Sequence, residues 1–304
     1  MVETVAQGAL FDPAALQCQN QQAGATGGGR NSAARKAGSQ MRRHRVILAL
    51  FGVQILALIW ATKSASIAAR PGSIPAASAS KGHLLYLTLS KGFKHDVIPH
   101  TTEVIKQIGE QSGAYDTTVT EDVSLFTAEG LKGYDAVMFY TTGELPLSDE
   151  QKRDFIEFIK AGHGFVGVHS ATDTFYMWKD YHDLIGGYFN SHPWHQQVKI
   201  DVADASDPLV SFLAPSFEVN DELYQIDDFD PGTTHVLLRL DPSSVDLKKP
   251  GARAKWYGWP VAWTRRDGQG RVFYCSLGHE RSTWDDPKFQ QLMLNGIQWA
   301  MGKK

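Results

Sequence analysis

The sequence predicts an α/β fold with a mostly parallel central sheet and helices on both of its faces. Short apolar runs at 84–90, 134–140 and 164–169 are typical of strands buried on both sides. Amphipathic helical patterns at 98–111 and 148–162 separate these runs. Strands that alternate with helices indicate parallel pairing, because each helical crossover returns the chain to the same end of the sheet.

The first elements follow from local pattern. Residues 84–90 are expected to form the first strand, and 91–96 the loop at its carboxyl end. Apolar residues then recur at helical spacing over 98–111, and 117–120 are expected to form a short strand. The helix at 148–162 carries a capping box, in which Gln151 stands three residues after Ser148.

The second half of the sequence is less regular. Residues 198–202 alternate in polarity, as in a half-exposed strand, and 234–240 predict another strand. A turn at 265–270 is expected to join two further strands at 260–264 and 270–277. A closing helix is predicted over 287–301.

The N-terminal region is predicted to lie outside the folded domain. Residues 1–40 lack apolar periodicity and are expected to be disordered, either because the start codon is misassigned or because they form a genuine tail. Residues 41–69 have a basic start followed by an apolar run of 16 residues at 46–61, which indicates a secretory signal or a retained membrane anchor. A Pro/Ala/Ser linker at 70–82 leads to the domain at 83–302.

Both interpretations of the apolar run predict export, to the periplasm or the extracellular space. The net charge of −3 offers no basic stripe for nucleic acid. The two cysteines are Cys18, in the N-terminal region, and Cys275, inside an apolar run. Processing after a signal would leave one thiol, so no internal disulfide is expected.

Histidines follow two of the predicted strands. His169 ends the apolar run at 164–168, and His279 stands four residues after Cys275 in a similar turn. The carboxyl ends of parallel strands form the crevice in which ligands bind. Imidazoles there suit acid/base chemistry or the binding of Zn²⁺ or Mn²⁺. The alternative is that both are structural histidines with satisfied hydrogen bonds.

Five motifs together resemble the trehalose-utilisation, or ThuA-like, family over residues 83–302. They are Gly92–His95, Gly167–Asp173, Asp221–Tyr224, Pro260–Arg265, and Gly270–Tyr274 followed by Ser276–His279. The resemblance implies a flavodoxin-like three-layer sandwich related to class I glutamine amidotransferases, and a link to carbohydrate metabolism. Those amidotransferases need a cysteine nucleophile where this sequence has His169, so glutaminase activity is not expected.

These observations give a candidate site. The catalytic candidates are His169, His279 and Glu222, and the metal candidates are His169, His192 and His279 for one divalent ion. No nucleotide cofactor is expected. His192 and His195 are expected in a loop because Pro193 lies between them, and Glu222 on a short irregular segment. Predicted substrate-binding residues are His95, Thr142, Ser170, Asp173, Trp194 and Tyr224.

The functional hypothesis is an enzyme that acts on a sugar or keto-sugar by histidine-based acid/base or metal-assisted chemistry, as a hydrolase, lyase or isomerase. Its alternative is a carbohydrate-binding module without turnover. A third hypothesis is a structural domain of a larger exported assembly. The predicted partner is a small carbohydrate, together with a membrane if residues 46–61 are retained, and a homo-oligomer is compatible with the sequence.

Overall fold

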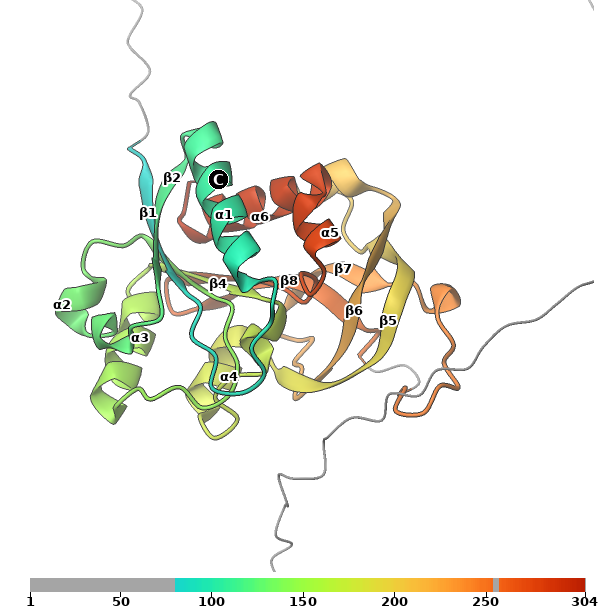
Figure 1. Cartoon of the computed structure of the whole chain (residues 1–304), viewed down its shortest axis with the longest axis horizontal. Helices are drawn as coiled ribbons and strands as arrows, with labels where there is room; N and C mark the ends of the chain where they lie inside the picture. The colour runs from blue at the N-terminus through green and yellow to red at the C-terminus, as the bar shows by residue number, and fades with distance from the viewer. Residues whose placement is uncertain (1–79, 254–256, 304) are drawn as a thin grey trace, which may run out of the picture. The chain divides into compact units, whose positions relative to one another are not determined.

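Within residues 80–253 and 257–303, which the computed structural model of the chain describes, nine strands form one sheet. Their order is β2-β1-β3-β4-β9-β8-β7-β5-β6 (Figure 1). The predicted disordered leader, the signal or anchor at 41–69 and nearly all of the 70–82 linker lie outside the described residues. No helix in the described part has the length and apolarity needed to cross a bilayer.

The first half of the sheet is parallel, as expected. It contains β2 (Tyr115–Thr120), β1 (Gly82–Leu87), β3 (Ala136–Phe139), β4 (Gly164–Val168) and β9 (Gly270–Cys275). Each neighbouring pair in this series runs in the same direction. The strands are almost wholly buried, apart from the polar edge strand β2. Apolar runs therefore predicted this half correctly.

The second half is antiparallel, and the prediction of a mostly parallel, flavodoxin-like sheet is wrong. A hairpin joins β9 to β8 (Pro260–Asp267), and β7 (His235–Leu240), β5 (Tyr188–Val202) and β6 (Ser216–Asp227) continue the sheet. All four neighbouring pairs from β9 to β6 run in opposite directions. The result is a mixed sheet, parallel on one side of β9 and antiparallel on the other.

The long β5–β6 pair explains the wrong prediction. Both strands carry polar and exposed residues along much of their length, because an antiparallel pair can leave one face in solvent. They therefore lack the continuous apolar run that marks a buried strand. Residues 192–195, expected in a loop, belong to β5, and Glu222, expected on an irregular segment, belongs to β6. Register shifts between Phe189 and Trp194 accommodate Pro193.

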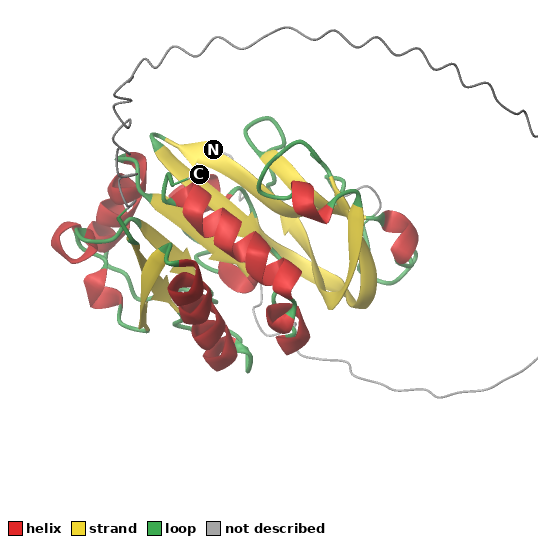
Figure 2. Ribbon diagram, turned by 90° about the horizontal axis from the view of Figure 1, so that it is seen from above, coloured by secondary structure: helices red, strands yellow, loops and turns green. Residues whose placement is uncertain are grey.

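Helices cover both faces of the sheet (Figures 1 and 2). On one side, α1 (Ile98–Ser112) and α6 (Pro287–Ala300) pack against the sheet beside the short α5 (Arg281–Asp285). On the other side, α3 (Asp149–Lys160) and α4 (Lys179–Ile185) build a second apolar core, next to α2 (Ala128–Leu131). Both bonds of the predicted Ser148–Gln151 capping box are present at the start of α3.

Candidate functional site

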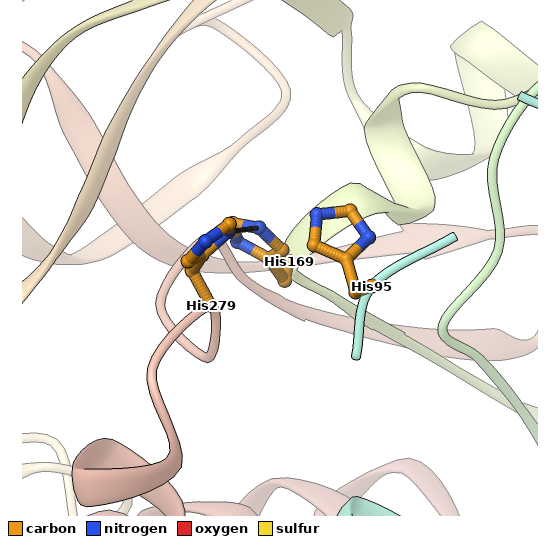
Figure 3. A group of neighbouring side chains, drawn as sticks. All are labelled: His95, His169 and His279. Atoms are coloured by element: carbon orange, nitrogen blue, oxygen red, sulfur yellow. Dashed lines mark hydrogen bonds between the residues drawn. The ribbon is translucent and has the colours of Figure 1, made fainter. Parts of the chain in front are cut away.

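Three histidines meet at the carboxyl ends of three parallel strands (Figure 3). His95 lies in the loop after β1, His169 directly follows β4, and His279 follows β9. The ring of His95 lies 4.8 Å from that of His169 and 5.2 Å from that of His279, measured between centroids. The crossover connections of the parallel half bring these loops to one edge, as the strand-end argument predicted.

His169 is held in an uncommon backbone conformation. Its φ is +46°, in the left-handed region that residues with a Cβ seldom adopt. The Nδ1–H donates to the Ser276 carbonyl at 2.8 Å, and the Tyr274 hydroxyl donates to the His169 carbonyl at 2.7 Å. With Nδ1 protonated, the Nε2 lone pair points into the site, where the Tyr224 hydroxyl lies 2.9 Å away.

Glu222 supplies the carboxylate of the site. Its Oε2 lies 3.3 Å from Nδ1 of His279 and 3.7 Å from Nε2 of His169. Its Oε1 lies 3.3 Å from Nδ1 of His192. The register of β5 and β6 places Glu222 directly opposite His195. The side chain is only 9% exposed, so its interactions with these imidazoles are weakly screened.

Asp221 fixes the turn that carries His279. This fully buried carboxylate accepts hydrogen bonds from the backbone amides of Gly278 and His279 at 2.8 and 3.0 Å. The Thr283 hydroxyl and the amide of Glu222 donate to it at 2.7 and 2.8 Å. Burial raises the pKa of Asp221 to about 6, while these donated bonds act in the opposite direction. Asp221 thus ties β6 to the loop after β9.

The three imidazoles have different pKa values because their surroundings differ. Burial lowers the pKa of His95 to about 4 and lowers that of His169 well below its usual range. Burial also acts to lower the pKa of His279, but the hydrogen bond and the charge of Glu222 outweigh it and raise that pKa. At neutral pH, His95 and His169 are therefore neutral bases, and His279 is the best proton donor among the three.

The donor geometry also fits a divalent metal ion. Nε2 of His169, Nδ1 of His279 and Oε2 of Glu222 are 3.3, 3.4 and 3.7 Å apart. A tetrahedral ion with bonds of about 2.1 Å holds its ligand atoms about 3.4 Å apart. His169 also has the hydrogen bond from its second ring nitrogen that orients metal-binding histidines.

His95 completes this set from the other side. Its Nδ1 is buried and has no hydrogen-bond partner within the described part of the chain. One ring nitrogen of His95 lies within 4.8 Å of a ring nitrogen of His169 and of one of His279. A buried imidazole nitrogen without a partner is costly, and a cation or a substrate oxygen would satisfy it.

The other predicted substrate-binding residues have different surroundings. Thr142 holds the 92–95 loop, since its hydroxyl donates to the Phe93 carbonyl at 2.8 Å. Asp173 accepts a hydrogen bond from Tyr176. Ser170 lies beside His169, and its buried hydroxyl has no partner among the described residues. Trp194 has no exposed surface and donates to the Asp246 carbonyl, so it presents no ring face to a sugar.

A cleft of about 360 Å³ adjoins the histidines, with His95 and His279 in its wall. Phe93 also lines the cleft, is 65% exposed and packs in a T-shaped arrangement with the His95 ring, with 4.8 Å between the centroids. Phe93 is not among the substrate-binding residues predicted from the sequence. An apolar side chain between Gly92 and the polar residues Lys94 and His95 was the signal that could have identified it.

Cys275 cannot serve as an amidotransferase nucleophile in this structure. It lies inside β9 without exposed surface, and burial raises the pKa of its thiol to about 12. The left-handed turn that follows β4 carries an imidazole at His169 instead. The crevice at the sheet edge is therefore built around imidazoles and one carboxylate.

Comparisons with known proteins agree with this architecture. The profile of the ThuA family, described as trehalose utilisation, matches residues 83–300. A putative ThuA-like protein of Bacteroides uniformis is 23% identical, with a TM-score of 0.61 over 74% of this chain and 94% of its own. One from Parabacteroides merdae is 22% identical, with a TM-score of 0.61 over 74% of this chain and 91% of its own.

These two likenesses concern the fold, because both identities are below 25%. No curated protein matches the sequence. The family match covers nearly all of the described residues, including the segments that carry His95, His169, Glu222 and His279. The chain belongs to the ThuA family.

Proposed function

We propose that this protein binds a carbohydrate in the cleft beside His95 and His279 and acts on it with the help of a divalent cation, Zn²⁺ or Mn²⁺. The observation that carries the proposal is the triangle of donors formed by His169, His279 and Glu222, of which His279 also lines that cleft. Membership of a family described by trehalose utilisation supports a sugar as the substrate class.

The residues of the site have different roles in the proposed reaction. A bound cation would polarise a carbonyl or hydroxyl oxygen of the sugar and so make neighbouring protons more acidic. His95 lines the cleft, and the low pKa that burial gives it keeps it an unprotonated base at neutral pH. The buried Tyr224 hydroxyl, whose pKa burial raises well above its usual range, stays neutral as a hydrogen-bond donor.

The same residues support chemistry without a metal. His279, with its pKa raised by Glu222, can donate a proton, while His95 accepts one. Pairs of titratable groups whose pKa values are pushed apart are the usual arrangement for acid/base catalysis. The metal content of the purified protein therefore distinguishes the two versions of the proposal. The reacting atoms of the sugar lie at the same point in both versions.

The test is a panel of hexoses, keto-sugars and disaccharides, titrated calorimetrically into the purified chain and followed for turnover by NMR. We expect one sugar class to bind and to be converted, and His169→Ala to abolish the conversion. Binding without conversion would instead support a carbohydrate-binding module. The absence of binding across the panel, with the metal ion added back, would contradict the proposal.

Replacing the exposed Phe93 tests the cleft itself. Phe93→Ala is expected to weaken binding of the sugar that responds in the panel by roughly tenfold, because an apolar ring face that lines the cleft is lost. Phe93→Trp should retain most of the affinity. The matched control is Met177→Ala, since Met177 is 88% exposed and lines a different pocket. Equal affinities for wild type and Phe93→Ala would remove this residue from the binding site.

A further inference from the structure

Glu222 has imidazoles on both sides of its carboxylate. The pair formed by His169 and His279 faces Oε2. A second pair, His192 and His195, faces Oε1, with Nδ1 atoms 3.3 and 4.0 Å away. A single cation at the first pair uses only Oε2, so the second pair has no role in the function proposed above.

Within the second pair, His195 is oriented in the way that metal-binding histidines are. His195 Nε2 lies 2.6 Å from Oε1 of Glu280 and, as the donor, leaves the Nδ1 lone pair directed at Glu222. In the carboxylate–histidine–metal arrangement, a carboxylate accepts from one ring nitrogen and the other nitrogen faces the metal. Here Glu280 takes the first position, and the other nitrogen faces Glu222. A lone pair that faces a carboxylate oxygen needs a proton or a cation between them.

The backbone fixes this placement. His195 and Glu222 are direct cross-strand partners on β5 and β6. His192 reaches the same oxygen from the same strand as His195, through the register shift before Trp194. Glu280 follows His279 in the loop after β9. Both histidines are nearly half exposed, so a solvated ion can reach them from outside.

We infer that the site holds two divalent cations, bridged by the carboxylate of Glu222. This inference rests on the proposed function, since it adds a second ion to the first. The second ion is bound by Oε1 of Glu222 and Nδ1 of His192 and His195, with Glu280 behind His195. Imidazole and carboxylate donors suit Zn²⁺ or Mn²⁺, and a bridging carboxylate holds two such ions about 3.5–4 Å apart.

Outside this site, one other group in the described part of the chain has donor atoms close enough together to bind an ion. It consists of Asp204, Asp207 and His235. There Nε2 of His235 lies 3.4 Å from a carboxylate oxygen of each aspartate. Asp204 and Asp207 also accept hydrogen bonds from backbone amides within their own turn. Variants of this group are therefore the proper control for stoichiometry.

The experiment counts bound ions. The full chain is stripped with a chelator, dialysed, loaded with Mn²⁺ and measured by elemental analysis and electron paramagnetic resonance. We expect two equivalents of Mn²⁺ and the spectrum of a coupled pair. His195→Ala is expected to bind one equivalent with an uncoupled spectrum, while His235→Ala keeps two coupled ions.

Glu280→Ala is a second, milder variant that keeps the test valid if His195→Ala impairs folding. It removes only the carboxylate behind His195. It should weaken the second ion by about 10- to 100-fold and leave the first in place. One equivalent in the wild type would overturn the second ion but leave the first, and with it the proposed function. A wild type that binds no ion would contradict both the second cation and the cation of the proposed function. Two equivalents that survive in His195→Ala but not in His235→Ala would place the second ion elsewhere.

Discussion

Loss of the His169 imidazole is expected to abolish tight metal binding. His169→Ala should lower the affinity for Zn²⁺ by roughly 100-fold or more, because removal even of an outer partner costs 10- to 100-fold and His169 is a direct ligand in our proposal. The imidazole has no exposed surface, and its Nδ1–H bond to Ser276 already fixes its direction. Competition titration with a chromophoric chelator measures the change.

The matched control is His163→Ala. His163 precedes β4, whereas His169 follows it, so the two histidines stand at opposite ends of one strand. The control should bind Zn²⁺ like the wild type. Circular dichroism and thermal unfolding of both variants separate a lost ligand from a lost fold. An unchanged Zn²⁺ affinity in a folded His169→Ala variant would exclude this imidazole as a ligand.

Asp221→Asn is expected to cause the largest loss of stability among single changes in the site, about 3 kcal/mol in the free energy of unfolding. The carboxylate is fully buried and accepts four hydrogen bonds. An amide keeps one acceptor oxygen and places an NH₂ group against donors that then have no partner. Urea unfolding followed by tryptophan fluorescence measures the difference.

Glu218→Gln is the control for Asp221→Asn, since it is also a carboxylate-to-amide change on β6 but at an exposed position. Its unfolding free energy should stay within about 0.5 kcal/mol of the wild type. The Asp221 variant should also bind metal more weakly, because Asp221 accepts the backbone amide of His279. Equal unfolding midpoints for the two variants would show that the Asp221 network does not hold this loop.

Local pattern predicted the parallel half of the fold well. Apolar runs located β1, β3 and β4, and the capping box located the start of α3 within one residue. These elements are recognisable because burial on both faces of a strand demands a continuous apolar run, and a helix needs a defined first turn. The positions of His95, His169 and His279 after strands followed from the same reasoning.

The antiparallel half could not be predicted in this way. Strand β5 carries three polar side chains in a row from His195 to Gln197 and, after Val198, a charged one at Lys199. The pairing of β5 with β6 gives their backbone groups partners and leaves many of these side chains in solvent. The direction of a strand depends on the strand it pairs with, and the paired residues range from Asp201 and Ser216, 15 apart in sequence, to Tyr188 and Asp227, 39 apart.

The sequence by itself predicted candidate residues for the chemistry and determined that three imidazoles follow buried strands, because the apolar runs that mark those strands are a local pattern. Only the tertiary structure decided that Glu222 lies opposite His195, that Asp221 holds the loop of His279, and that Trp194 is in the core while Phe93 is exposed. Cross-strand register and side-chain burial depend on contacts between distant segments, and these are settled only when the whole sheet assembles.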